Sequence, residues 1–296
     1  MNFLERLSIT LGTLYDLFDV KIAGDNLNYS IIKDLLKNQI FKDRVEFTFD
    51  LKKLILTEKY HMTDVIGVAA LDKNFEGNFS GILNSEEDIC INFVKPRDKQ
   101  TQFTVKSDNA GSIFRVLKAY ENGYNGDFFF SGKLKPNGGI LGKLTVNNIK
   151  VLNGPILAQL ISLASLNGLI DMLAGNGIFF EKVEGNIDSD SGRTIVRNGY
   201  AVGQSIGITM DGTFTKDLDS RSGTKMKASG GLSPFFNINN AVKMIPFFGE
   251  LLGGKEGEGA IGFNYKLEGT RKSPLVFINP FSILTPGILR NSLIEQ

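Results

Sequence analysis

The sequence predicts a mainly β protein with a few amphipathic helices, and three observations carry this prediction. Apolar and polar residues alternate with a period of two along many short segments, which is typical of strands with one dry and one wet face. The connections between these segments are short and rich in Gly, Asn and Asp, which favours antiparallel hairpins. Strands do not alternate with long helical segments, so a parallel sheet is not expected.

The composition agrees with this class. A chain of 296 residues is long enough for one large or two ordinary domains with a buried core. It holds 23 Phe and 33 Gly but no Trp, and Phe in short segments separated by Gly is typical of repeated strands and tight turns. The 33 basic residues are matched by 32 acidic residues. Without a basic excess to bind a phosphate backbone, nucleic acid is not an expected partner.

The predicted strands begin at Val45. Val45, Phe47, Phe49 and Leu51 alternate with polar residues, which predicts a half-buried strand. Further strands are predicted over residues 89–93, 103–105, 128–134, 144–151, 206–214 and 261–267.

Helices are predicted in five places. Residues 1–20 carry apolar side chains at helical spacing, and these are Phe3, Leu4, Leu7, Leu11, Leu14 and Leu17. Because Glu5 and Arg6 interrupt the start of this segment, it does not resemble a signal peptide. The other predicted helices span residues 30–37, 110–120, 153–173 and 237–252.

Residues 153–173 form the most apolar stretch, and three interpretations of it stay open. Residues 155–173 carry a single charge, Asp171, and are long enough to cross a bilayer. Gln159 and Asn167, however, would need polar partners inside the membrane. We favour two short helices packed on the sheet, with a helix at a membrane surface as the next alternative and a transmembrane helix as the last.

The residue types that perform most catalysis are scarce. His61 is the only histidine, so a catalytic triad or a histidine metal site would have to use it. Cys90 lies within a predicted strand, and no second cysteine or nearby histidine activates it. The glycine-rich residues 138–145 lack the spacing of a phosphate loop, and Leu144 follows Lys143 where such a loop has Ser or Thr. We therefore expect no catalytic residue, no metal, no cofactor and no enzymatic activity.

A set of short phrases in a fixed order is more specific than any single motif. They are residues 107–111 (SDNAG), 144–148 (LTVNN), 151–158 (VLNGPILA), 163–169 (LASLNGL), 175–180 (GNGIFF) and 245–252 (IPFFGELL), and the closing residues 276–290 follow. Their order over residues 63–290 resembles the C-terminal region of the AsmA-like family of Gram-negative bacteria, in the branch that includes YhdP and relatives of TamB.

The resemblance implies a strongly curved antiparallel sheet that forms a groove, with amphipathic helices packed on it. It also implies a non-enzymatic role in phospholipid transport and outer-membrane biogenesis, with phospholipid, the membrane surface and other envelope proteins as partners. The expected location is the periplasmic side of the cell envelope, associated with the inner membrane if the chain belongs to a longer one. We expect this chain to lack the family's N-terminal anchor and long repeat region. We therefore expect residues 1–60 to be the remnant of a repeat region and residues 61–296 to be the AsmA-like C-terminal module.

Three sets of residues are predicted to carry this role. The residues expected to line a lipid-binding groove are Ile206, Ile208, Met210, Phe214, Ile261, Phe263, Tyr265 and Leu267. The helix residues expected to cap the groove or touch a membrane are Leu157, Leu160, Ile161, Leu169, Phe247, Phe248 and Leu251. The motif residues expected to serve structure are Asn279, Pro280, Ser282, Pro286, Gly287 and Arg290.

The physical reason for a groove is that the dry face of a strand must be covered. Acyl chains can cover it, since each buried methylene contributes about 0.8 kcal/mol. The face could equally be an ordinary core. Two other functions stay open: an interaction module that receives a partner's strand at its sheet edge, and a lipid or glycan hydrolase, which the supply of His and Cys disfavours.

Overall fold

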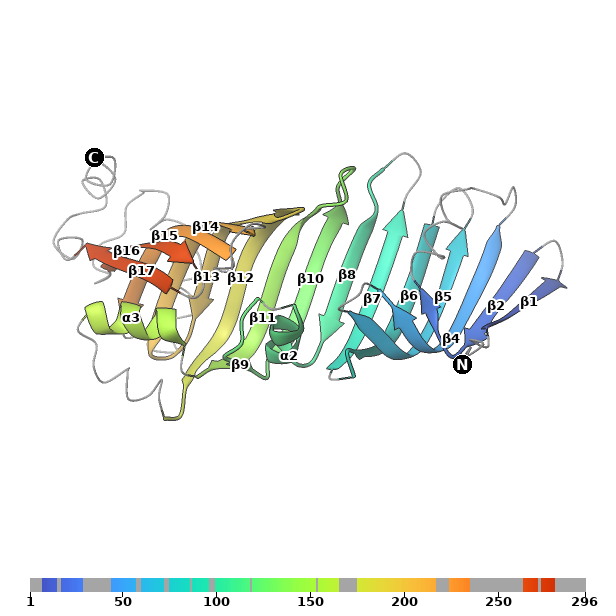
Figure 1. The fold of residues 1–296 in the computed structure, drawn as a ribbon, viewed down its shortest axis with the longest axis horizontal. Coiled ribbons are helices and arrows are strands. Elements are labelled where there is room, and N and C mark those ends of the chain that lie inside the picture. The colour runs from blue at the N-terminus through green and yellow to red at the C-terminus, as the bar shows by residue number, and fades with distance from the viewer. Residues whose placement is uncertain are drawn as a thin grey trace, which may run out of the picture. The chain divides into compact units, whose positions relative to one another are not determined.

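The structure is a computed structural model that describes residues 7–14, 17–28, 44–56, 60–71, 75–85, 87–95, 99–117, 119–152, 154–164, 175–216, 224–234, 263–270 and 273–279. The chain divides into two compact units. The first comprises Met1–Glu121 and Asp127–Pro136, and the second comprises Asn122–Gly126 and Asn137–Gln296. Strands make up most of both units, which confirms the predicted mainly β class (Figure 1). Residue 60, where the sequence-based division of the chain was placed, lies within the first unit.

The first unit is a mixed sheet. Its strands are β1 (Leu7–Leu14), β2 (Leu17–Gly24), β3 (Leu27–Asn28), β4 (Val45–Ile55), β5 (His61–Leu71), β6 (Phe75–Leu83), β7 (Glu87–Lys95), β8 (Gln102–Ser107) and β10 (Asp127–Leu134). From β4 through β8 to β10 each strand pairs antiparallel with the next. β2 and β3, in contrast, run parallel to β4. The antiparallel pairings agree with the predicted antiparallel sheet, and the parallel pairing of β2 and β3 with β4 was not predicted.

The helix predicted over residues 1–20 is wrong. β1 and β2 form an antiparallel hairpin that pairs Leu7 with Gly24 and Leu14 with Leu17. The hairpin then joins the sheet through β4. Pairing with a distant strand therefore overrides a helical spacing that the local sequence shares with a strand. The predicted helices at residues 30–37 and 237–252 lie outside the described residues.

The register of the first unit sorts its residues into two faces. One row of directly opposed residues crosses six strands and consists of Phe49, Gly67, Phe79, Ile91, Val105 and Phe130. The adjacent row on the same face consists of Phe47, Ala69, Gly77, Phe93, Phe103 and Gly132. We call the face that carries these two rows the apolar face of the first unit. It confirms the predicted alternation in residues 45–51, 89–93 and 103–105.

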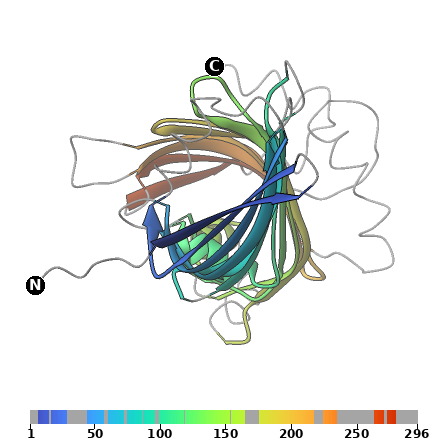
Figure 2. The same cartoon turned by 90° about the vertical axis from the view of Figure 1, so that its right-hand side faces the viewer.

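Helix α2 (Ala110–Val116) confirms the predicted helix at residues 110–120, in shortened form. Asn109 caps it by accepting a hydrogen bond from the Ser112 amide. Its Phe114 ring meets Phe128 of the apolar face edge-on, with 6.0 Å between centroids. Because Figure 2 shows α2 on the inner side of the curved strands of this unit, the apolar face is the concave one.

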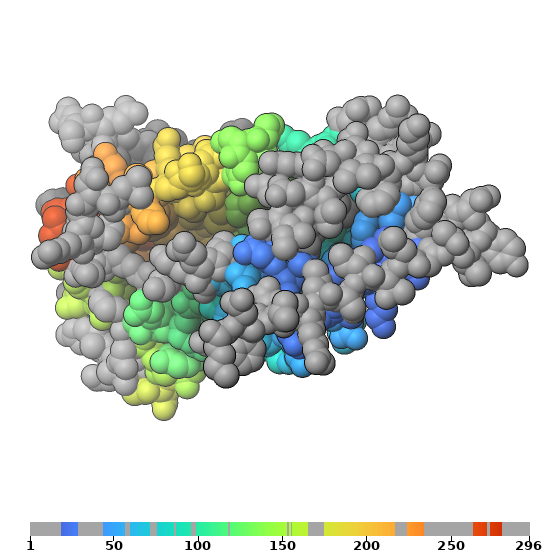
Figure 3. All heavy atoms as spheres, turned by 45° about the vertical axis from the view of Figure 1, so that its right-hand side comes forward, coloured from blue at the N-terminus to red at the C-terminus, as the bar shows by residue number. Residues whose placement is uncertain are grey.

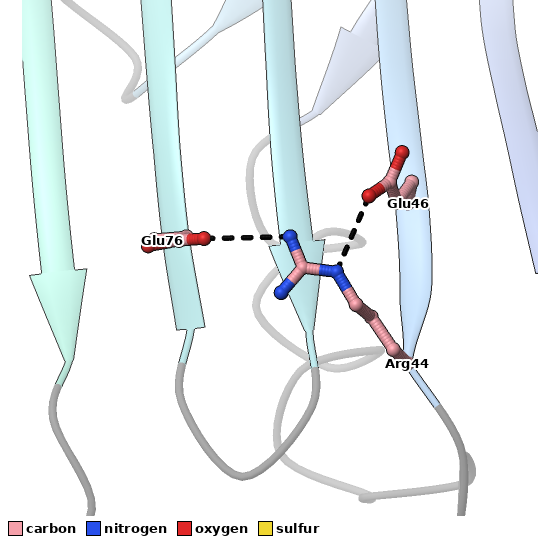
Figure 4. A network of polar contacts seen from close by, with 3 residues as sticks. All are labelled: Arg44, Glu46 and Glu76. Atoms are coloured by element: carbon pink, nitrogen blue, oxygen red, sulfur yellow. Dashed lines mark hydrogen bonds and ion pairs between the residues drawn. The ribbon is translucent and has the colours of Figure 1, made fainter. Parts of the chain in front are cut away.

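The opposite face of the first unit is polar. Across β6, β7 and β8 it carries mainly Glu, Asn, Ser, Asp, Gln, Thr and Lys side chains, together with Cys90, Ile82 and Val94. Near its rim the Arg44 guanidinium lies between two carboxylates, 3.2 Å from Glu46 and 3.4 Å from Glu76 (Figure 4). Glu46, Ala70 and Glu76 form one cross-strand row, so Arg44 separates two like charges across the short Ala70 side chain.

The second unit is an antiparallel meander. Its strands are β9 (Gly123–Tyr124), β11 (Ile140–Val151), β12 (Ile178–Asp190), β13 (Arg193–Val202), β14 (Ile206–Lys216), β15 (Thr224–Pro234), β16 (Phe263–Thr270) and β17 (Ser273–Asn279). From β11 to β17 each strand pairs with the next, and β9 pairs with the end of β11. An apolar face is defined by the cross-strand row Val146, Val183, Ala201, Ile208, Leu232 and Phe263.

Helix α3 (Pro155–Leu163) packs beside β17, as Figure 1 also shows. It begins with proline, whose missing amide costs nothing in the first turn. It is the described part of the predicted 153–173 helix, because residues 165–174 lie outside the description. Among the described residues, no helix combines the length and the apolar character needed to cross a membrane.

Candidate functional site

The apolar face of the first unit is only partly covered. Phe79 on β6, Ile91 and Phe93 on β7, and Phe103 and Val105 on β8 are half-buried. These five residues are neighbours in the two cross-strand rows. We call them the central apolar patch. Because solvent reaches large apolar side chains here, the patch has unfilled capacity to bury apolar groups.

The two sides of the patch are closed. On the β4 and β5 side, Val45, Phe49, Leu51 and Val65 are at most 3% exposed. On the other side, Phe128 and Phe130 of β10 are each 7% exposed, and Phe128 lies against α2. The open surface is therefore confined to the three strands between these two packed regions.

Aromatic rings pave the patch at a regular spacing. The Phe79 ring lies 5.1 Å from Phe49 and 5.7 Å from Phe93, and the second pair is nearly parallel at 16°. The Phe79 and Phe93 rings each lie over a glycine on the preceding strand. A Cβ added to Gly77 would lie 2.6 Å from the Phe93 ring, and one added to Gly67 would lie 2.8 Å from an atom of Phe79. Glycine thus lets the rings lie down along the sheet, so that their faces form a smooth floor.

The patch carries no charge. From Gly77 to Gly81 on β6, from Ile89 to Phe93 on β7 and from Phe103 to Val105 on β8, every position on this face holds glycine, Ile, Val or Phe. A charged ligand would lose its hydration here without gaining a partner. The surface can therefore accept hydrocarbon, and it offers no polar group for a reaction.

The predicted groove residues of the second unit share one face. Ile206, Ile208, Met210 and Phe214 alternate along β14, and β15 separates them from Phe263, Tyr265 and Leu267 on β16. Ile206 is fully buried, and Tyr265 and Leu267 are each 4% exposed, so these three serve as core. Ile208, Met210, Phe214 and Phe263 are half-buried. Ile261 lies outside the described residues, and binding of lipid by this set stays a prediction.

The predicted helix residues that are described point into the protein. Leu157, Leu160 and Ile161 of α3 are between 0% and 8% exposed, so these side chains are not available to a membrane and serve as packing. Leu169, Phe247, Phe248 and Leu251 lie outside the described residues. Of the motif residues, Asn279 ends β17, and Pro280, Ser282, Pro286, Gly287 and Arg290 are outside the description.

The two reactive residue types have ordinary surroundings. The His61 amide donates to the Asn84 side chain over 2.9 Å, and its carbonyl accepts from the Asn84 amide, which fastens the β5–β6 hairpin. The Cys90 sulfur lies 3.7 Å from the Asn78 amide nitrogen and 3.9 Å from that of Asn92. Within the part of the chain that the structure describes, no group of His, Cys, Asp and Glu residues could hold a metal ion.

The densest polar cluster surrounds Glu184 on the polar face of the second unit. Its carboxylate accepts from Tyr200 on β13 over 2.6 Å and from Thr145 on β11 over 3.3 Å. Lys143 and Lys182 lie 2.8 and 2.9 Å away. Burial alone would raise the pKa of Glu184, but the hydrogen bonds from Lys143, Tyr200 and Lys182 lower it to about 2. The cluster ties β11, β12 and β13 together and leaves the carboxylate no capacity as a base.

This cluster predicts an acid-sensitive contribution to stability. Because the pKa of Glu184 falls from 4.5 to about 2 on folding, the contribution is present above about pH 4.5 and is lost as the pH falls toward 2. We expect Glu184→Gln to cost about 1–2 kcal/mol near neutral pH, after allowance for solvent screening. Urea unfolding across this range should show the difference from the unsubstituted chain shrinking below pH 4.5. A difference that stays constant with pH would contradict the assignment.

Comparison of the chain with protein-family models, with curated proteins and with solved structures finds no match. The resemblance to the AsmA-like family therefore stays a prediction.

Sequence reasoning missed the central apolar patch as a site. The signal was present, since Phe75, Gly77, Phe79 and Gly81 alternate with polar residues along β6. Because glycine is not counted as an apolar residue in such a pattern, no strand was predicted over this segment. That Gly77 lies under the Phe93 ring of the next strand follows only from the register.

Proposed function

We propose that this chain is a non-enzymatic protein of the cell envelope that binds acyl chains of phospholipids and takes part in phospholipid transport and outer-membrane biogenesis. The observation that carries the proposal is the central apolar patch: an uncharged, ring-paved surface, half-exposed on the concave side of a sheet. Hydrocarbon is the ligand that such a surface stabilises, at about 0.8 kcal/mol for each buried methylene. The resemblance to AsmA-like proteins supports the setting, on the periplasmic side of the envelope.

A protein-interaction role in the envelope is the second candidate. The polar face of β5 exposes Ile66 and Val68, at 65% and 58%. Exposed β-branched pairs of this kind also occur in protein interfaces. This surface lies on the opposite face from the central apolar patch, so the two roles can be separated by substitution.

Site-specific cross-linking tests the proposal. Phe93 and Val94 are adjacent on β7 but point to opposite faces, with Val94 44% exposed on the polar face. A photoreactive benzoylphenylalanine at position 93, irradiated in a Gram-negative host, is expected to cross-link to phospholipid. The same group at position 94 is the matched control and is expected to give little lipid adduct. Equal lipid adducts at the two positions, or none at position 93, would overturn the proposal.

A further inference from the structure

The polar face of the second unit carries an exposed apolar pair at β17. Leu275 and Phe277 are 56% and 55% exposed and lie two residues apart on the same face of the strand. Spheres of β16 and β17, coloured red, reach the molecular surface in Figure 3. Two adjacent, exposed, large apolar side chains form a small apolar patch, and exposed apolar patches mark contact sites for a protein or a membrane.

The surroundings of this pair are basic. Phe277 lies directly opposite Lys266 on β16, and Leu275 lies opposite Glu268, which faces Lys227 on β15. Along β15 and β16 this face carries three lysines, Lys225, Lys227 and Lys266, against the single carboxylate of Glu268. All four side chains are exposed. Lysines around a protruding Leu and Phe match a surface that is negatively charged outside and apolar beneath.

A second exposed pair on the chain has the opposite surroundings. Ile66 and Val68 on β5 are as exposed as Leu275 and Phe277. Their direct cross-strand neighbours are Asp50, Thr48, Ser80 and Asn78, so no cation lies directly opposite them. Arg44 and Lys52 on the same face are each paired with a carboxylate. Exposure alone therefore does not distinguish the two pairs, whereas charge does.

We propose that Leu275, Phe277, Lys227 and Lys266 form a contact site for the surface of an anionic phospholipid bilayer. The two apolar side chains enter the boundary between headgroups and acyl chains, and the lysine ammonium groups lie at the lipid phosphates. We assign this role to a sheet face in place of α3, because Leu157, Leu160 and Ile161, the residues of α3 that were predicted to touch a membrane, are buried in the protein. The site is independent of acyl-chain binding by the central apolar patch, which lies in the other unit.

Sedimentation with vesicles tests this inference on the full chain. The chain is expected to sediment with vesicles of phosphatidylcholine and phosphatidylglycerol, and much less with phosphatidylcholine alone. Raised salt should weaken the binding, since exposed charges are screened over about 10 Å at 0.1 M ionic strength. Lys227→Gln and Lys266→Gln are each expected to lower the affinity about fivefold. The double variant Leu275→Ser/Phe277→Ser is expected to lose more than about tenfold.

The matched control is the double variant Ile66→Ser/Val68→Ser, which removes an equally exposed pair and should bind vesicles like the unsubstituted chain. Circular dichroism checks that each variant is folded. The inference is overturned if the unsubstituted chain does not sediment with anionic vesicles, or if the control loses as much binding as Leu275→Ser/Phe277→Ser. It is also overturned if Leu275→Ser/Phe277→Ser instead abolishes a dimer in gel filtration while vesicle binding is absent. Lipid cross-linking at position 93 is read separately, so either proposal can fail alone.

Discussion

Gly230→Ala is expected to destabilise the second unit by about 3–5 kcal/mol, the largest effect of any single methyl group that we predict. A Cβ at this position would overlap the Thr209 carbonyl oxygen and lie 2.7 Å from its carbon and 3.0 Å from the Tyr265 hydroxyl. That carbonyl accepts a 2.8 Å hydrogen bond from the Tyr265 phenol, and the Thr209 hydroxyl accepts one from the Gly231 amide. Moving Thr209 would break both buried hydrogen bonds.

The Tyr265 phenol keeps its proton and therefore remains a hydrogen-bond donor to the Thr209 carbonyl. Burial, with the charge of Asp211, raises the pKa of Tyr265 well above its usual range, so the phenol stays protonated near neutral pH. The ring itself crosses Gly230, its partner in the register. The absence of a side chain at Gly230 therefore lets one aromatic residue pack and hydrogen-bond across two strands.

Urea unfolding measures this prediction, and Gly185→Ala is its control. Gly185 is also a strand glycine and is buried, but the nearest atoms to an added Cβ are 3.4 and 3.5 Å away. We expect Gly185→Ala to change the free energy of unfolding by no more than about 0.5 kcal/mol. Equal unfolding midpoints for the two variants would show that the close packing around Thr209 does not limit stability.

Val105→Asp is expected to lower the amount of bound phospholipid about tenfold or more. Val105 lies in the central apolar patch, directly between Ile91 and Phe130. The position is half-buried, so an aspartate can stay hydrated in the empty protein and the chain still folds. An acyl chain across the patch would have to desolvate the carboxylate without offering it a partner.

The adjacent residue provides the control for Val105→Asp. Thr104 belongs to the same strand but faces the polar side, opposite Asn92 and Ser131. Thr104→Asp adds the same charge one residue away and is expected to leave bound lipid unchanged. The amount of lipid is measured by extraction and mass spectrometry of the purified variants. If both variants lose lipid equally, the effect belongs to net charge or stability and the patch has no part in it.

Much of the fold could be predicted because apolar and polar residues alternate along individual strands. The strands at residues 45–51, 89–93 and 206–214 were each predicted from a period of two, and β4, β7 and β14 contain them. The N-terminal hairpin could not be predicted, because Leu7, Leu11 and Leu14 fit a helix as well as a strand. Strand is favoured over helix because β2 pairs with β4, which lies beyond residues 29–43. The local sequence does not show this pairing.

The chemical character of the candidate site was predicted, but its position in the fold was not. Sequence reasoning expected an apolar surface in place of a reactive group and assigned it to β14 and β16. There Ile206, Tyr265 and Leu267 are filled core, because β15 contributes Leu232 and Met226 to the same face. The more open surface lies on β6, β7 and β8, where the side chains of the central apolar patch are only half-buried. Alternation marks a dry face, but only tertiary packing decides whether protein or ligand covers it.

The most direct test of acyl-chain binding is native mass spectrometry, with lipid extraction, of the unsubstituted chain purified from a Gram-negative host. Phospholipid bound to the folded chain, and lost in Val105→Asp but kept in Thr104→Asp, is the predicted result. A folded chain that carries no phospholipid, and takes none up when phospholipid is supplied, would contradict the account.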